Sequence, residues 1–279
     1  MNQNGPRSSN VADTRLILHA KHAAETGSNS VVIRSSDTDV VVLAVYFQWE
    51  IDTELFPQGK YSKSKWKFLD IGSISKKLGI ILSKALLGFQ AFSGCDTVSR
   101  FSGKGKKTFF KVLKSSEVFT NAMTHLGDKL DIEEKLLRDC ERGLCQVYGF
   151  DTHNINDVRY DMLSKGVESH QIPPTKDALR LHILRANYQA YIWKHALNGH
   201  FIAPSPHGHG WLVKDFKISI LWMRKDPAPK ALLEFLHCKT CKKCDTYRCL
   251  CKKSGFQCSD ICGCSALHCE NSQDTPGDS

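Results

Sequence analysis

Nine cysteines crowd the C-terminal part of the sequence, and their number and spacing suit metal binding. Neighbouring cysteines are often separated by only one or two residues. A segment this short and this rich in cysteine cannot build a hydrophobic core, so metal ions or disulfides must hold it together. The nine thiols are Cys238, Cys241, Cys244, Cys249, Cys251, Cys258, Cys262, Cys264 and Cys269.

The odd number of thiols and the character of the chain favour zinc over disulfides. The polar N-terminal residues show no secretory pattern, and we therefore expect an intracellular, reducing compartment in which thiols stay free. Two separate tetrahedral zinc sites would leave one cysteine over. Three zinc ions need about twelve ligand positions, which nine thiolates supply if three of them bridge. We expect this three-zinc cluster, with the surrounding lysines and arginine offsetting its negative charge.

The cysteine-rich segment contains the pattern C-x-C-x6-C-x3-C-x-C and the text TYRCLC. It resembles the CXC domain of tesmin-type and male-specific-lethal chromatin proteins, although the first and last cysteines are spaced differently. The resemblance implies a trinuclear zinc cluster that docks on DNA, with Arg248 entering a groove. Tyr247, Lys252 and Lys253 are then expected to contact phosphates or sugars. The alternative is a structural zinc knot that contacts protein.

Four aspartates form a second set of potential metal ligands: Asp13, Asp37, Asp39 and Asp96. They fall where the sequence predicts strand ends. A D-x-D pair holds two carboxylates on one side of an extended segment, and acids from neighbouring segments complete an oxygen-ligand site for Mg²⁺ or Mn²⁺. Two such ions activate water and stabilise the leaving oxygen in phosphodiester cleavage.

The elements that must position these residues are typical of an α/β fold. Runs of β-branched residues at 31–33 and 40–45 predict strands of a parallel sheet. Strands followed by acids and then by helices place a crevice at the carboxyl ends of the strands. Further strands are predicted at 68–71 and 217–222, and helices at 13–24, from about 73, at 83–92, at 106–113, within 117–150 and from 175 to about 197.

The text GCDTVSRFSGKGKKTFFKVL resembles the segment of flap endonucleases and related PIN-like nucleases in which a metal-binding G-x-D precedes a helix–two-turn–helix. In order and spacing the resemblance spans about residues 12–113. It implies a PIN-like parallel-sheet domain in which the four aspartates are the catalytic, metal-binding carboxylates. The DNA-binding residues it implies at the turn are Gly103, Lys104, Gly105, Lys106 and Lys107.

Two departures from the nuclease pattern leave several functions open. Val11 stands where the related nucleases carry an acid, and their N-terminal acidic strand has no counterpart in this sequence. The protein is then either a metal-dependent, structure-specific endonuclease weakened by the missing acids, or a non-catalytic chromatin or transposon-derived DNA-binding protein with a vestigial site. A third possibility is that the CXC segment mediates protein assembly.

Composition and charge set the domain plan and the partner. The 279 residues are 41% hydrophobic with a net charge of +9, and basic residues concentrate in 100–114 and 238–270. We therefore expect DNA as the partner, no membrane association, and a nuclear location. The expected domains are a partial PIN-like domain at 1–115, a mainly helical extension at 116–230, the zinc–cysteine module at 236–271 and a disordered tail at 272–279.

Overall fold

The computed structural model divides the chain into two compact units, Met1–Arg224 and Lys225–Ser279. The structure describes residues 7–59, 67–215, 217–225, 238, 243–258, 262–264 and 269–272, and describes side chains from residue 12 onwards except at Ser169. Cys241 and most of the predicted tail therefore lie outside the described residues. The first unit is mixed α/β, and the second carries the cysteine cluster.

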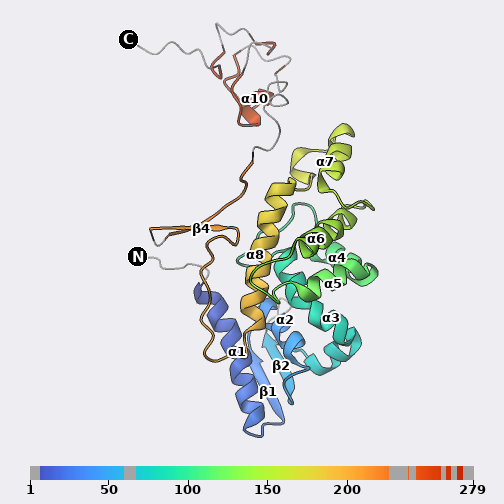
Figure 1. Ribbon diagram of the computed structural model, residues 1–279, viewed down its shortest axis with the longest axis vertical. Coiled ribbons are helices and arrows are strands. Elements are labelled where there is room, and N and C mark those ends of the chain that lie inside the picture. The colour runs from blue at the N-terminus through green and yellow to red at the C-terminus, as the bar shows by residue number, and fades with distance from the viewer. Residues whose placement is uncertain are drawn as a thin grey trace. The chain divides into compact units, whose positions relative to one another are not determined.

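Helices dominate the first unit (Figure 1). The sequence prediction of an α/β protein is confirmed at this level. The helices are α1 (Arg7–Glu25), α2 (Thr38–Phe47), α3 (Ile71–Ser93), α4 (Lys106–Ser115), α5 (Glu117–His125), α6 (Glu134–Val147), α7 (Ile155–Ser164), the short η1 (Ser169–Gln171) and α8 (Lys176–Lys194). The strands are β1 (Ser30–Arg34), β2 (Glu54–Gly59), β3 (Lys67–Phe68), β4 (Trp211–Lys214) and β5 (Lys217–Ile220).

The parallel pairing in the described part of the first unit is between β1 and β2, from Ser30 opposite Glu54 to Arg34 opposite Gln58. Strand β3 pairs antiparallel with β2 at Gln58 and Phe68. The prediction of a strand at 31–33 is confirmed. The predicted strand at 68–71 is reduced to β3, because Asp70 caps α3 and the helix begins at Ile71. Strand β2 was not predicted, because Pro57 within the short run ELFPQG argues against a strand.

The prediction of a second parallel strand over 40–45 is wrong, because this run belongs to α2. The Asp37 carboxylate accepts a hydrogen bond of 2.8 Å from the Asp39 backbone N–H and so caps the helix. The buried Val40, Leu43, Ala44 and Phe47 follow helical spacing, and they place one face of α2 in the core. The β-branched neighbours Val41 and Val42 concealed this periodicity.

Helix α3 is the central element of the first unit, and it contacts α2, α5 and α8. Gly88 permits the close approach to α5, because a Cβ atom there would lie 2.1 Å from the Met123 carbonyl oxygen. The last turns of α3 bury Phe92, whose ring centroid lies 5.5 Å from that of Phe101 and 5.8 Å from that of Phe119. This aromatic core fixes the end of α3, which leads directly to Asp96.

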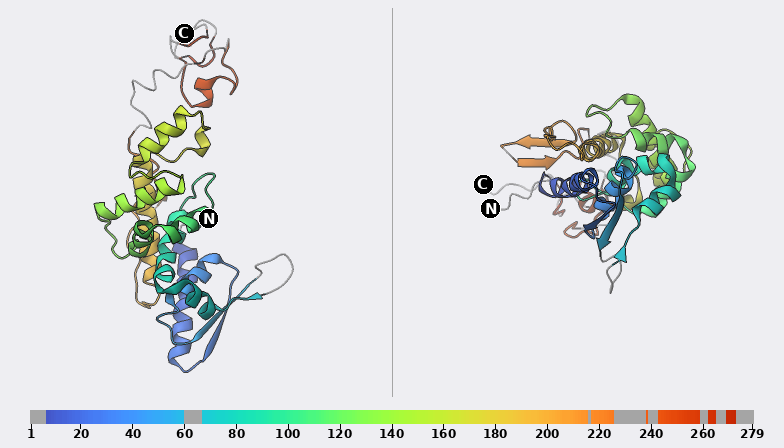
Figure 2. Two further views of the ribbon diagram at one scale, coloured as in Figure 1. Left: turned by 90° about the vertical axis from the view of Figure 1, so that its right-hand side faces the viewer. Right: turned by 90° about the horizontal axis from the view of Figure 1, so that it is seen from below.

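Helix α8 lies against α3 and holds the β4–β5 hairpin beside it (Figure 2). The helix predicted from residue 175 is confirmed, with Thr175 as its N-cap accepting a hydrogen bond from the Ala178 N–H, but it ends at Lys194 rather than near residue 197. The buried Arg185 donates through Nη1 to the carbonyls of Gly210 and Leu221, at 3.2 and 2.9 Å. None of the described helices is both long and apolar enough to cross a membrane.

The second unit contains the short helix α10 (Leu250–Lys253) and loops that carry the cysteines. Its described buried cluster consists of cysteines alone. Backbone hydrogen bonds join distant parts of this unit, from the Cys258 N–H to the Asn271 carbonyl and from the Glu270 N–H to the Lys243 carbonyl. The predicted cysteine module lies within this unit, whereas the predicted boundary at 115/116 falls inside the first unit, between α4 and α5.

Candidate functional site

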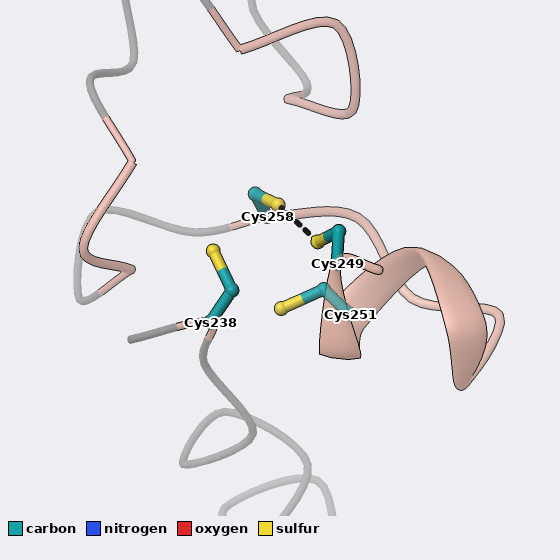
Figure 3. Close-up of side chains that lie close together, drawn as sticks. All are labelled: Cys238, Cys249, Cys251 and Cys258. Carbon is teal, nitrogen blue, oxygen red and sulfur yellow. Dashed lines mark hydrogen bonds between the residues drawn. The ribbon is translucent and has the colours of Figure 1, made fainter. Parts of the chain in front are cut away.

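The described cysteine sulfurs lie at the spacing that a tetrahedral metal imposes. The Sγ–Sγ distances are 3.7 Å between Cys249 and Cys258 (Figure 3) and 3.6 Å between Cys251 and Cys262. Two thiolates bound at about 2.3 Å to one tetrahedral zinc ion are about 3.8 Å apart, whereas a disulfide needs about 2.05 Å. None of the described cysteines forms a disulfide. The cluster could therefore bind zinc.

The described thiols fall into overlapping groups of four whose sulfurs all lie within 4.8 Å of one another. Within the described part of the chain, groups of this kind consist of cysteine alone. Figure 3 shows one of them, with four sulfurs facing a common centre. The groups are Cys238, Cys249, Cys251 and Cys258; Cys238, Cys258, Cys262 and Cys264; and Cys244, Cys258, Cys264 and Cys269.

Helix α10 supplies electrostatic support to one ligand. Burial raises the pKa of Cys249, but the backbone N–H groups of Lys252 and Cys251 and the neighbouring thiols outweigh this effect and lower the pKa to about 7. A substantial thiolate fraction is thus present at neutral pH, and the thiolate is the form that binds a metal. The short helix explains why Cys249 and Cys251 are held side by side.

The four predicted aspartates interact electrostatically in the first unit, but the strand ends predicted for Asp13 and Asp96 are wrong. Asp13 lies within α1, Asp37 is the N-cap of α2, and Asp39 lies in the first turn of α2. Asp96 lies in the loop between α3 and α4. The D-x-D pair is therefore presented by a helix N-terminus, just beyond the carboxyl end of β1, and not by an extended strand.

Burial and the charges of neighbouring aspartates perturb two of the four carboxyl groups, Asp13 and Asp39. Burial, followed by the charges of Asp37, Asp39 and Asp96, raises the pKa of Asp13 to about 6. Burial also raises the pKa of Asp39 to about 6, with further increases from Asp37 and Asp96. Mutual repulsion of this kind is what a divalent cation relieves, since it neutralises several carboxylates at once. The carboxylates nevertheless lie farther apart than the clustered thiols.

Gln90 is a member of this site that no pattern in the sequence indicates. Its Nε2 donates a hydrogen bond of 2.6 Å to Asp39 Oδ1, and both side chains are buried. This bond lowers the pKa of Asp39 against the larger effect of burial. Gln90 lies in the last turn of α3, so only the tertiary contact of α3 with α2 reveals its role.

The loop that carries Asp96 is braced from several sides. Gly94 adopts a φ of 111°, and the Cys95 N–H donates a hydrogen bond of 3.0 Å to the Val98 carbonyl. Thr97 Oγ1 donates a hydrogen bond of 2.6 Å to Oε1 of Gln189, a buried residue of α8. The Lys106 ammonium donates to Ser93 Oγ at 3.0 Å and to the Gly94 carbonyl at 2.6 Å. The position of Asp96 is thus set by the fold.

The other predicted DNA-binding residues of the first unit lie at the turn before α4. Gly103 has a φ of 68°, and Gly105 is the N-cap of α4 without a side-chain cap. Lys107 is exposed, whereas Lys104 is half-buried with its Nζ 4.7 Å from the centroid of the Tyr148 ring. The turn therefore presents backbone N–H groups beside two exposed lysines, Lys106 and Lys107.

The predicted DNA-binding residues of the second unit are mostly exposed. Tyr247 has 75% of its surface exposed, and Arg248 and Lys253 are also exposed. Lys252 is half-buried, and its Nζ donates 2.7 Å to the Asp245 carbonyl. These residues flank Cys249 and Cys251, which belong to one of the groups of four sulfurs.

The fold and the two sites define a mixed α/β protein with a C-terminal cysteine cluster that could bind zinc. The chain has no significant match among protein-family models, curated proteins or solved structures. Its function is therefore argued from the sites.

Proposed function

We propose that this protein is a nuclear DNA-associated zinc protein with a PIN-like first unit, a nuclease-like divalent-metal site and a CXC-type DNA-binding module. Hydrolysis of phosphodiester bonds with Mg²⁺ or Mn²⁺ is the activity proposed for the acidic site. The observation that carries this proposal is the electrostatic coupling of Asp13, Asp37, Asp39 and Asp96, which come from three separate segments of the chain.

The arrangement around the aspartates supports metal-assisted cleavage. Asp37 and Asp39 follow β1, and ligands of open α/β sheets bind beyond the carboxyl ends of parallel strands. Two metal ions held by such carboxylates would activate water and stabilise the leaving oxygen. The turn with Gly103, Gly105 and Lys107 would bind the phosphate backbone close to Asp96, which lies in the same α3–α4 connection.

The described cysteines support a cluster of three zinc ions. Each of the three sulfur groups would hold one ion; Cys238 and Cys264 each belong to two groups, and Cys258 belongs to all three. If each shared thiolate bridges two ions and the other five bind one, eleven of twelve positions are filled. One position then remains for Cys241, which lies outside the described residues. A cluster of three zinc ions and nine thiolates requires three bridging thiolates, and the three shared cysteines would supply them.

A cleavage assay tests the acidic site. The zinc-loaded protein is incubated with flap, hairpin and linear DNA, with and without added Mn²⁺. We expect Mn²⁺-dependent cleavage that the Asp37→Ala variant lacks, while Asp52→Ala, which changes an exposed aspartate, retains it. Equal residual activity in wild type and Asp37→Ala would reject the nuclease assignment.

A second candidate function is a DNA-binding protein that does not cleave its substrate. It is favoured by one observation: the aspartates do not converge as tightly as the cysteines do. It predicts salt-sensitive DNA binding that is lost on Arg248→Ala or on zinc chelation, with no cleavage at any Mn²⁺ concentration. If no DNA is bound at low salt, the cysteine module acts in protein assembly instead.

A further inference from the structure

Lys106 begins α4, and its ammonium group is turned back into the protein. It donates to the Ser93 hydroxyl at 3.0 Å and to the Gly94 carbonyl at 2.6 Å. Both acceptors lie at the end of α3, two and three residues before Asp96. Lys106 and the adjacent Lys107 are both exposed, but Lys107 forms no comparable bond within the described part of the chain.

We propose that Lys106 is a positioning residue for the acidic site, and that it holds the Gly94–Asp96 loop instead of binding a DNA phosphate. This inference rests on the proposed metal site, since it assigns Lys106 to the support of one of its ligands. It separates two neighbouring lysines that the sequence alone treats as equivalent.

The chemistry at the end of α3 explains why a cation is needed there. The last carbonyl groups of a helix have no partner within the helix, and the helix C-terminus carries partial negative charge. Gly94 ends α3 with a φ of 111°, and a Cβ atom at this position would lie 2.8 Å from the Arg100 Cβ. The chain therefore reverses direction in a confined space, and the hydrogen bonds of Lys106 connect this turn to the start of α4.

The positive charge of Lys106 also acts on the aspartates of the acidic site. It lowers the pKa of Asp39, so it offsets part of the repulsion among the aspartates. Desolvation lowers the pKa of Lys106 itself, and the nearby Cys95 and Asp39 only partly oppose this. The hydrogen bonds from Lys106 to Ser93 and Gly94 offset the cost of this desolvation.

The test compares Lys106→Met with Lys107→Met in the full-length, zinc-loaded protein. Lys106→Met is expected to weaken Mn²⁺ binding about 10-fold or more, as removal of groups that orient metal ligands commonly does. It should also speed amide hydrogen exchange in residues 94–98 and leave the salt dependence of DNA binding unchanged. Lys107→Met should instead leave Mn²⁺ binding intact. It should reduce by about one the salt slope, that is, the slope of the logarithm of the DNA-binding constant against the logarithm of salt concentration.

Two further variants guard against misfolding. Lys106→Arg retains a cationic donor and should restore most of the Mn²⁺ affinity, and Ser93→Ala removes one acceptor and should give a smaller loss in the same direction. Equal effects of Lys106→Met and Lys107→Met on the salt slope, with unchanged exchange at 94–98, would overturn the inference. If the wild type binds no Mn²⁺, the proposed metal site fails, while hydrogen exchange still decides whether Lys106 positions the loop.

Discussion

The acidic site and the cysteine cluster are held in place by different forces. The aspartates lie on helices and loops of a unit with an extensive apolar core, and Gln90, Gln189 and Lys106 support the site through hydrogen bonds. The described buried cluster of the second unit consists only of cysteines. The proposed acidic site therefore rests on the core and hydrogen bonds of its own unit, whereas the second unit is expected to depend on metal for folding.

Zinc removal should give the largest difference between the two units. Zinc binding in small cysteine-rich modules is worth about 10–16 kcal/mol, and this free energy is also the folding energy of the module. Chelation should unfold the second unit and leave the unfolding transition of the first unit unchanged. All five tryptophans precede residue 225, so tryptophan fluorescence reports on the first unit alone. Native mass spectrometry should find three zinc ions before chelation.

A core substitution should show the opposite pattern. Phe92 is fully buried among aromatic rings, so Phe92→Ala should lower the free energy of unfolding of the first unit by about 3–5 kcal/mol. Its zinc content should stay at the wild-type value. Phe68→Ala removes a ring that is 57% exposed and should change stability by less than about 0.5 kcal/mol. Loss of zinc in Phe92→Ala would show that the units do not fold independently.

Removal of the Gln90 donor should destabilise the acidic site in a pH-dependent way. In Gln90→Leu the ionised Asp39 loses a buried hydrogen bond, which costs about 2–3 kcal/mol at pH 8. The pKa of Asp39 is raised to about 6, so at pH 5 the carboxyl group is mostly protonated and the loss should be smaller. Urea unfolding followed by tryptophan fluorescence measures both values. An equal loss at the two pH values would contradict this account of Gln90.

Acid should weaken the first unit through His182. This buried histidine contacts the Phe92 carbonyl through Nε2 at 2.8 Å, and burial lowers its pKa to about 4. Because the unfolded histidine titrates near 6.5, stability is complete above that pH and is lost as the pH falls toward 4, by about 2 kcal/mol at pH 5. Asp13 and Asp39 have raised pKa values and act with the opposite sign. His182→Gln should remove the histidine contribution, so the difference between the two proteins isolates it.

The contrast between the units also explains what the sequence could and could not predict. The cysteine cluster was predictable because ligand density and spacing are local properties, and the described thiols do gather. The helices with regular apolar spacing, such as α4 and α8, were predictable for the same reason. The run at 40–45 was mispredicted because its β-branched residues favour strand, while the Asp37 cap and burial against α3 select a helix.

The supporting residues of the acidic site depend on contacts between distant segments. Gln90 is separated from Asp39 by 51 residues, and Gln189 from Thr97 by 92. No spacing rule connects such pairs. Lys106 and Lys107 are adjacent and chemically identical in the sequence, and only the orientation of α4 gives them different surroundings.

Equilibrium binding of Mn²⁺ to the zinc-loaded protein tests the central claim most directly, because it depends on the aspartates acting as one site. Free Mn²⁺ is followed by electron paramagnetic resonance for wild type, Asp39→Asn and the exposed control Asp52→Asn. We expect saturable binding by wild type and Asp52→Asn, weakened about 10-fold or more in Asp39→Asn. Equal binding by all three proteins, or none by the wild type, would contradict a divalent-metal site at Asp13, Asp37, Asp39 and Asp96.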